Sequence, residues 1–115
     1  MDLAEFLQAR LDEDEREARQ PVPGPWEIQG EPRETLVYSR PFGTRVAVGW
    51  LRDLRHIARH DPARVLAEVA TKRRMVERHR VCDDVWFGDV STCPDMRDLA
   101  APYADHPDYR EEWRP

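Results

Sequence analysis

Large apolar side chains are scarce in this chain, and their number limits the hydrophobic core that it can build. Leu, Ile, Val and Phe make up 23 of the 115 residues, whereas 36% of the residues are charged. Ordinary globular domains carry roughly 25% charged residues, and an apolar content this low borders on that of disordered chains. We therefore expect one small, thin-cored domain over residues 1–115.

The same composition argues against several classes of protein. No apolar run approaches the roughly 20 residues of a bilayer-spanning helix. The opening MDLAEFLQAR has neither the basic start nor the apolar stretch of a signal peptide. Two cysteines, Cys82 and Cys93, are too few for a disulfide scaffold, and a non-secreted chain keeps them reduced. We expect a cytoplasmic protein that does not engage a membrane.

Charge changes sign twice along the chain. Residues 1–35 carry a net charge of −6, residues 36–80 carry +7 and residues 81–115 carry −6. Either both acidic ends neutralise the basic middle within the domain, or the middle meets an external polyanion such as nucleic acid. A dedicated nucleic-acid binder rarely carries a net negative charge, and this chain carries −5, which favours internal neutralisation.

Residues 1–51 predict a helix followed by a small sheet. Residues 1–20 form the helix, because Leu3, Leu7 and Leu11 recur every fourth residue and Pro21 stops it. Residues 22–51 predict a PGPW turn and a three-stranded antiparallel β-meander, with strands starting at Trp26 and covering 35–40 and 45–51. The third strand would place Val46, Val48 and Trp50 on one face, and such a sheet needs a helix to cover it.

Residues 53–80 predict a helical pair packed on that sheet. Asp53 caps the first helix, and Asp61-Pro62 starts the second, which runs to about His79. Arg73 falls within its apolar arc, where its stem would pack while its head reaches water or an acidic partner. Residues 81–115 then predict a loop from which Trp86 and Phe87 plug the core, and short helices at 94–101 and 107–113. The expected fold class is α+β.

Four segments resemble one family: FLQARLDEDEREAR, PGPW, HIARHDPARVLAEVATKRR and the closing PYADHPDYREEWRP. The chain resembles small actinobacterial and actinophage proteins of unknown function along its whole length. The PGPW turn, the strands and the following helix are similar to a module of phage accessory proteins. The resemblance implies a context and no mechanism. Many relatives carry more cysteines before the closing motif, in a pattern that suggests a metal knuckle, whereas this chain has Cys82 and Cys93 there.

Two groups of residues suggest metal chemistry. Zinc ligands of acceptable type are His79, Cys82, Cys93 and His106, although their spacing lacks tight paired knuckles. A metal-dependent hydrolase site would use His56, His60 and Asp61, together with Asp105, His106 and Asp108. Asp61-Pro62 fits a helix cap equally well, and no HExxH motif is present. We therefore expect no cofactor and no catalytic residue, with zinc as the alternative.

The closing motif and the basic helix supply the candidate interaction residues. Tyr103, Tyr109 and Trp113 either seal the core or form a partner-binding surface, because such residues dominate interface hot spots. The first interpretation is favoured by the thin core. Arg64, Arg74 and Arg78 lie on the polar face of the long helix. A face left open would favour nucleic acid, and one covered by the acidic tail would favour a protein partner.

These patterns predict a non-enzymatic accessory protein of phage or mobile-element type that binds another macromolecule, a host or phage protein first. The alternative is a small zinc-stabilised or nucleic-acid-binding module that uses the basic face of residues 64–80. The weakest alternative is the metal-dependent hydrolase.

Overall fold

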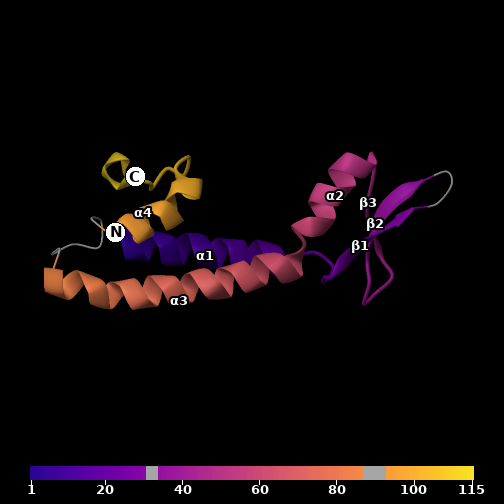
Figure 1. Ribbon diagram of the computed structural model, residues 1–115. Helices are drawn as coiled ribbons and strands as arrows, with labels where there is room; N and C mark the ends of the chain where they lie inside the picture. Colours follow the sequence, from indigo (N-terminus) through magenta and orange to yellow (C-terminus); the bar gives the residue numbers. More distant parts are fainter. Residues whose placement is uncertain (31–33, 87–92) are drawn as a thin grey trace. The chain divides into compact units, whose positions relative to one another are not determined.

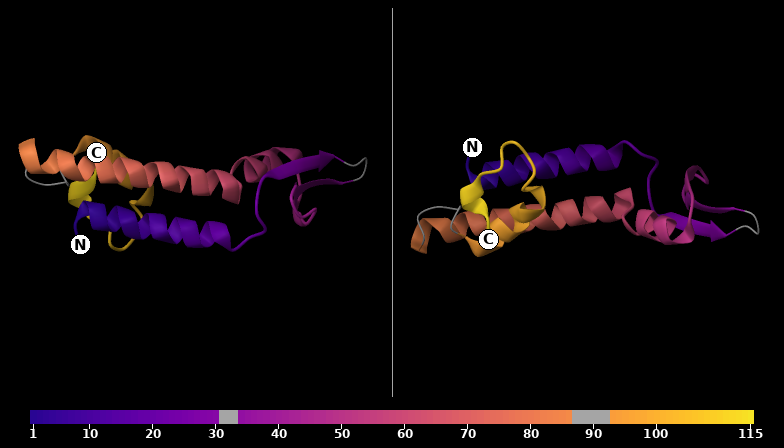
Figure 2. Two further views of the ribbon diagram at one scale, coloured as in Figure 1. Left: turned by 90° about the horizontal axis from the view of Figure 1, so that it is seen from below. Right: turned by 90° about the horizontal axis from the view of Figure 1, so that it is seen from above.

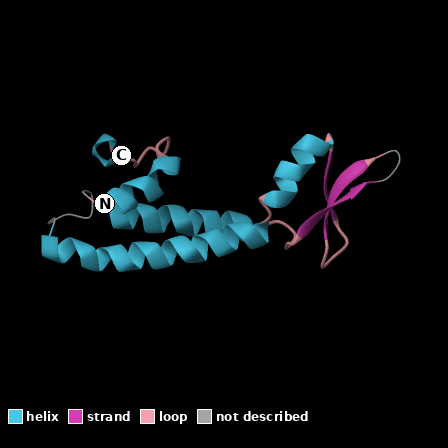
Figure 3. Ribbon diagram, viewed as in Figure 1, coloured by secondary structure: helices cyan, strands magenta, loops and turns pink. Residues whose placement is uncertain are grey.

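The computed structural model describes residues 1–30, 34–86 and 93–115 (Figure 1). Its elements are α1 (Leu3–Arg19), β1 (Trp26–Gly30), β2 (Thr35–Ser39), β3 (Arg45–Val48), α2 (Leu51–Arg59), α3 (Pro62–Trp86), α4 (Pro94–Ala100), η2 (Ala101–Tyr103) and η3 (Glu111–Trp113). The predicted α+β fold class is confirmed, with its N-terminal helix, three strands, helical pair and short helical tail (Figure 3).

The residues group into two compact units. We call residues 14–68 the sheet unit, and residues 1–13 with 69–115 the tail unit. The boundary between the units falls within α1 and within α3, so each of these helices contributes residues to both. No helix in the described ranges is both long and apolar enough to cross a membrane.

The sheet unit contains the predicted antiparallel meander. The strand order is β1-β2-β3, with Ile28 opposite Val37 and Leu36 opposite Val48. α2 lies against β1 and β2 and covers this small sheet (Figure 1). Val37 and Leu54 are almost fully buried, because α2 turns its apolar side toward the strands.

The predicted third strand is too long, and the predicted cap of α2 is wrong. β3 ends at Val48, which pairs with Leu36, and β2 begins only one residue earlier at Thr35, so little of β2 remains for a longer β3 to pair with. α2 already begins at Leu51, with Trp50 in extended conformation as its N-cap residue. Asp53 therefore lies in the first turn of α2, where a carboxylate favours the positive helix end without capping it.

Asp61 caps α3 as predicted, and it also fixes the PGPW turn. Its Oδ1 accepts the backbone N–H of Arg64 at 2.9 Å, while its Oδ2 accepts the backbone N–H of Trp26 at 2.9 Å. A Cβ atom added to Gly24 would lie 2.7 Å from the same Oδ2, so glycine permits this close approach. One buried carboxylate thereby joins the start of α3 to the start of β1.

α3 continues well beyond the predicted end at His79, to Trp86. The sequence after His79 contains neither proline nor glycine before Gly88, so nothing in it stops the helix. The charged Cys82-Asp83-Asp84 segment that predicted a loop is helical. The predicted packing of the Trp86 and Phe87 side chains lies outside the described part of the chain.

In the tail unit, residues 3–13 of α1 and 69–86 of α3 run side by side (Figure 2). The core comprises Leu3, Phe6, Leu7, Leu11, Val69, Val76, Met96, Ala100 and Trp113. As predicted, the head group of Arg73 extends away from the apolar side of α3 to an acidic partner. Its Nη1 lies 2.8 Å from Asp12 Oδ1. The predicted helix over 107–113 is reduced to η3, and the backbone N–H of Asp108 donates to His106 Nδ1 at 3.0 Å.

Candidate functional site

The aromatic residues of the closing motif gather around Phe6 of α1, whose side chain is fully buried. The centroid of the Phe6 ring lies 5.1 Å from that of Trp113, 5.8 Å from that of Tyr109 and 6.5 Å from that of Tyr103. Trp113 is only 1% exposed, whereas the two tyrosines are half-buried. This geometry gives Trp113 a packing role and leaves its indole with no surface to offer a partner.

Arg10 belongs to the same cluster, although sequence reasoning missed it. Its guanidinium is buried, lies 5.1 Å from the centroid of the Phe6 ring and meets His106 Nδ1 at 2.7 Å. Glu13 pairs with it at 3.0 Å, which offsets the cost of burying the charge. His106 Nδ1 also accepts the N–H of Asp108 at 3.0 Å, so its lone pair is engaged by donors. In the sequence, the burial of Arg10 could have been inferred from its position between Leu7 and Leu11 of the apolar stripe.

Two of the four predicted zinc ligands meet in the tail unit. His79 Nδ1 lies 3.3 Å from Cys93 Sγ, and His79 Nε2 lies 3.3 Å from Asp95 Oδ2. His106 is instead engaged by Arg10, and the Cys82 side chain lies outside the described part of the chain. Within the described ranges, no group of three or more potential ligands converges. Asp95 nevertheless contacts the second ring nitrogen of His79, and a carboxylate in that position supports histidine ligands in metal sites.

We predict that the chain folds without a metal. Elemental analysis of protein purified without chelator should detect far less than one zinc per chain, and an excess of chelator should leave the melting temperature unchanged. The reason is that a pair of ligands alone holds zinc poorly. A stoichiometric zinc content that depends on His79 and Cys93 would contradict this prediction.

The histidines of the hydrolase alternative lie at the end of α2. The rings of His56 and His60 are 4.3 Å apart between centroids, and both side chains are exposed. His60 Nδ1 lies 2.9 Å from the carbonyl oxygen of His56. Both oxygens of Asp61 accept backbone N–H groups, so this carboxylate acts as a cap in the structure.

Among the residues that the structure describes, Tyr38 and Arg114 have raised pKa values, and both keep their usual charge states at neutral pH. The pKa of Tyr38 is raised, mainly because its hydroxyl donates to Glu27 at 3.0 Å. The pKa of Arg114 is raised, mainly by its hydrogen bond to Glu111. Both shifts carry the groups further from neutral pH, so neither becomes an acid or a base for catalysis there.

The predicted basic face of α3 divides between the two units. Arg64 belongs to the sheet unit, whereas Arg74 and Arg78 belong to the tail unit, and all three are exposed. Arg64 Nε pairs with Glu68 Oε1 of the same helix at 3.0 Å, and Arg74 donates to Thr71 Oγ1 at 3.1 Å. The acidic partner found for Arg64 therefore comes from α3 itself.

A second basic surface, on α2, was not predicted. Arg52, Arg55 and Arg59 lie on the solvent side of this helix, opposite the buried Leu54. Trp50 lies at its start and is 75% exposed. The side chains of Trp50, Leu51 and Arg52 line a shallow hollow of about 250 Å³. We call Trp50, Leu51, Arg52, Arg55 and Arg59 the α2 patch; all of it lies within the sheet unit.

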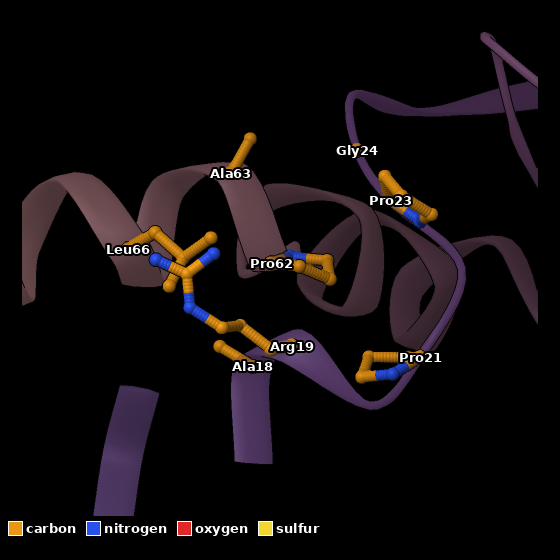
Figure 4. A pocket seen from close by; sticks show the side chains of 8 residues that line it. All are labelled: Ala18, Arg19, Pro21, Pro23, Gly24, Pro62, Ala63 and Leu66. Carbon is orange, nitrogen blue, oxygen red and sulfur yellow. The ribbon is translucent and has the colours of Figure 1, made fainter. Parts of the chain in front are cut away.

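Another hollow of the sheet unit has a volume of about 470 Å³ (Figure 4). Its lining is mostly apolar and consists of Ala18, Arg19, Pro21, Pro23, Gly24, Pro62, Ala63 and Leu66. Arg19 is the charged residue in this lining, and its guanidinium is already paired with Glu15 at 3.0 Å. The lining offers apolar surface and lacks groups suited to acid–base or nucleophilic chemistry.

Comparison with protein families confirms that the chain belongs, over its whole length, to a family of unknown function. The model of a family of unknown function (DUF6221) matches residues 1–115, and the chain therefore belongs to that family. No curated protein matches the chain, and no solved structure matches it.

Proposed function

We propose that this member of the family is a non-enzymatic cytoplasmic accessory protein of actinobacterial phage or mobile-element type, which acts by binding another macromolecule. The observation that carries the proposal is the α2 patch. A chain with so few large apolar residues buries Trp113 to 1% exposure yet leaves Trp50 75% exposed. Trp and Arg are the residue types that dominate binding energy at interfaces, and the patch combines them.

The phage context is supported by two resemblances: the closing PYADHPDYREEWRP segment is similar to small actinobacterial and actinophage proteins, and the PGPW turn, with the strands and following helix, is similar to a module of phage accessory proteins. The non-enzymatic role is supported by the chain's own motifs. Its glycines do not form a phosphate-binding loop, and its sequence lacks a recognisable nucleophile motif. The partner expected from the sequence is a host or phage protein, and nucleic acid is the alternative partner.

A zinc-stabilised module is the second candidate, and one contact favours it. His79 and Cys93 meet at 3.3 Å, close to the separation of two ligands around one tetrahedral zinc ion. The zinc content described above tests this candidate directly.

Capture from a lysate of an actinobacterial host tests the proposed function. We expect the immobilised protein to retain a macromolecule that Trp50→Ala no longer retains. Phe42→Ala is the matched control, because Phe42 is 65% exposed and lies in the loop at the other end of β3. Both variants should melt like the parent, since exposed residues contribute within about 0.5 kcal/mol to stability.

The proposal would be contradicted if the parent protein retained nothing beyond what an unrelated acidic protein retains. Equal loss of the retained macromolecule in both variants would also contradict it, because binding would then not depend on the α2 patch.

A further inference from the structure

We infer that the α2 patch binds single-stranded nucleic acid, with the indole of Trp50 stacked on a base and the arginines on the phosphates. This inference rests on the proposed function and names the class of its partner. It differs from the sequence-based alternative, which placed nucleic acid on residues 64–80 of the long helix.

The backbone holds Trp50 in a fixed position although its side chain is exposed. Its carbonyl oxygen accepts the N–H groups of Asp53 and Leu54, each at 3.0 Å, so the residue forms the first turn of α2. The indole thus extends from a rigid helix end rather than from a free loop. An exposed indole on an anchored backbone offers a stacking platform, and every base has a π-face that can stack on it.

The arginines of the patch form a stripe along α2. Arg52, Arg55 and Arg59 are spaced three and four residues apart, so they follow one side of the helix. They extend over roughly 10 Å of helix, and their long side chains can reach successive phosphates of one strand. Trp50, the N-cap residue of α2, lines the same hollow as Arg52 at the start of the stripe, so one strand can meet the indole and the arginines.

Two of the three arginines in the stripe lack an acidic partner in the described part of the chain. Four other arginines of the sheet unit have acidic partners, Arg19 with Glu15, Arg40 with Glu27, Arg45 with Glu34 and Arg64 with Glu68, whereas Arg16 has no ion pair among the described residues. Arg55 and Arg59 have no ion pair among the residues that the structure describes, and Arg52 meets Asp53 only at 3.8 Å. In a chain with 23 acidic residues, such a stripe on a folded helix points to an external anion.

The combination of groups favours a single strand over the other polyanions. An acidic protein would satisfy the arginines but would leave the indole without a stacking partner, and a duplex keeps its bases paired and stacked. The hollow formed by Trp50, Leu51 and Arg52 places an apolar side chain and a guanidinium beside the indole. Arginine adds a cation–π contribution when a base is stacked there.

Fluorescence anisotropy with a labelled thymidylate dodecamer tests the inference. We expect Trp50→Ala to weaken binding about tenfold, because stacking on one base contributes about that factor. Arg55→Ala with Arg59→Ala should weaken it further and make it less dependent on salt. For three phosphate contacts, the slope of log affinity against log salt should be about −2 in the parent. A duplex of equal length should bind more weakly than the single strand.

Arg74→Ala with Arg78→Ala is the matched control, because it removes two exposed arginines from α3 and should change the affinity less than about twofold. Loss of binding in this control but not in the α2 variants would overturn the inference in favour of the α3 face. An unchanged affinity in Trp50→Ala would overturn the stacking assignment. If the oligonucleotide does not bind but a protein is captured in a Trp50-dependent way, the inference is overturned and the proposed function stands. If neither binding nor capture is observed, the inference and the proposed function are both contradicted.

Discussion

Trp113→Ala should lower the free energy of unfolding by about 3–5 kcal/mol, the usual cost of truncating a buried tryptophan. The side chain is 1% exposed, its ring centroid lies 5.1 Å from that of Phe6, and the guanidinium of Arg110 lies 5.4 Å from it. Small domains have a total stability of about 5–15 kcal/mol, so this loss is a large fraction of the whole. The melting temperature, followed by circular dichroism, should fall sharply whether or not a partner is present.

Trp50→Ala is the matched control for this measurement. It removes the same side chain from a position that is 75% exposed, so the melting temperature should stay close to that of the parent. If Trp113→Ala melted like the parent and lost its partner instead, the closing motif would be an interaction surface and its packing role would be wrong.

Asp61→Ala has the second-largest expected effect, about 2–4 kcal/mol of destabilisation. The substitution removes the cap of α3, which contributes about 1 kcal/mol, and leaves the N–H of Trp26 without its acceptor, which costs about 1–3 kcal/mol. Both hydrogen bonds measure 2.9 Å, and the carboxylate is buried. Urea denaturation should show a lower midpoint, and Asp61→Asn, which keeps one acceptor oxygen, should fall between the two proteins.

Asp53→Ala serves as the control for Asp61→Ala. Asp53 also lies in the first turn of a helix, but it is exposed and does not cap α2, so its loss should cost no more than about 0.5 kcal/mol. Equal effects of the two substitutions would contradict the double role assigned to Asp61.

The sequence predicted those elements whose limits are set by local chemistry. Pro21 marked the end of the first helix, and Asp61-Pro62 marked the start of α3, because proline and a capping carboxylate act on the backbone beside them. The end of α3 was missed because charged residues alone do not terminate a helix. Trp50 was assigned to a strand because aromatic residues suit strands, while the shift in pairing at Val37/Tyr38 depends on tertiary packing.

The candidate site was less accessible to sequence reasoning than the packing of the tail. Trp113 stood out because a thin core needs its large aromatics, and the structure buries it. The arginines of α2 did not stand out, because polar residues three and four apart occur on the solvent side of any helix. Their meaning depends on two facts that the sequence does not show, the exposure of Trp50 and the missing ion pairs of Arg55 and Arg59 within the described residues.

The central claim is that Trp113 stabilises the tail unit while the α2 patch carries binding. The most direct test is to photo-crosslink the intact protein to an iodouridine-substituted single strand and to map the adducts by mass spectrometry. The account predicts adducts at Trp50 and within residues 51–59, and their loss in Trp50→Ala. Adducts concentrated in residues 74–78 or in the closing residues 102–115 would contradict it.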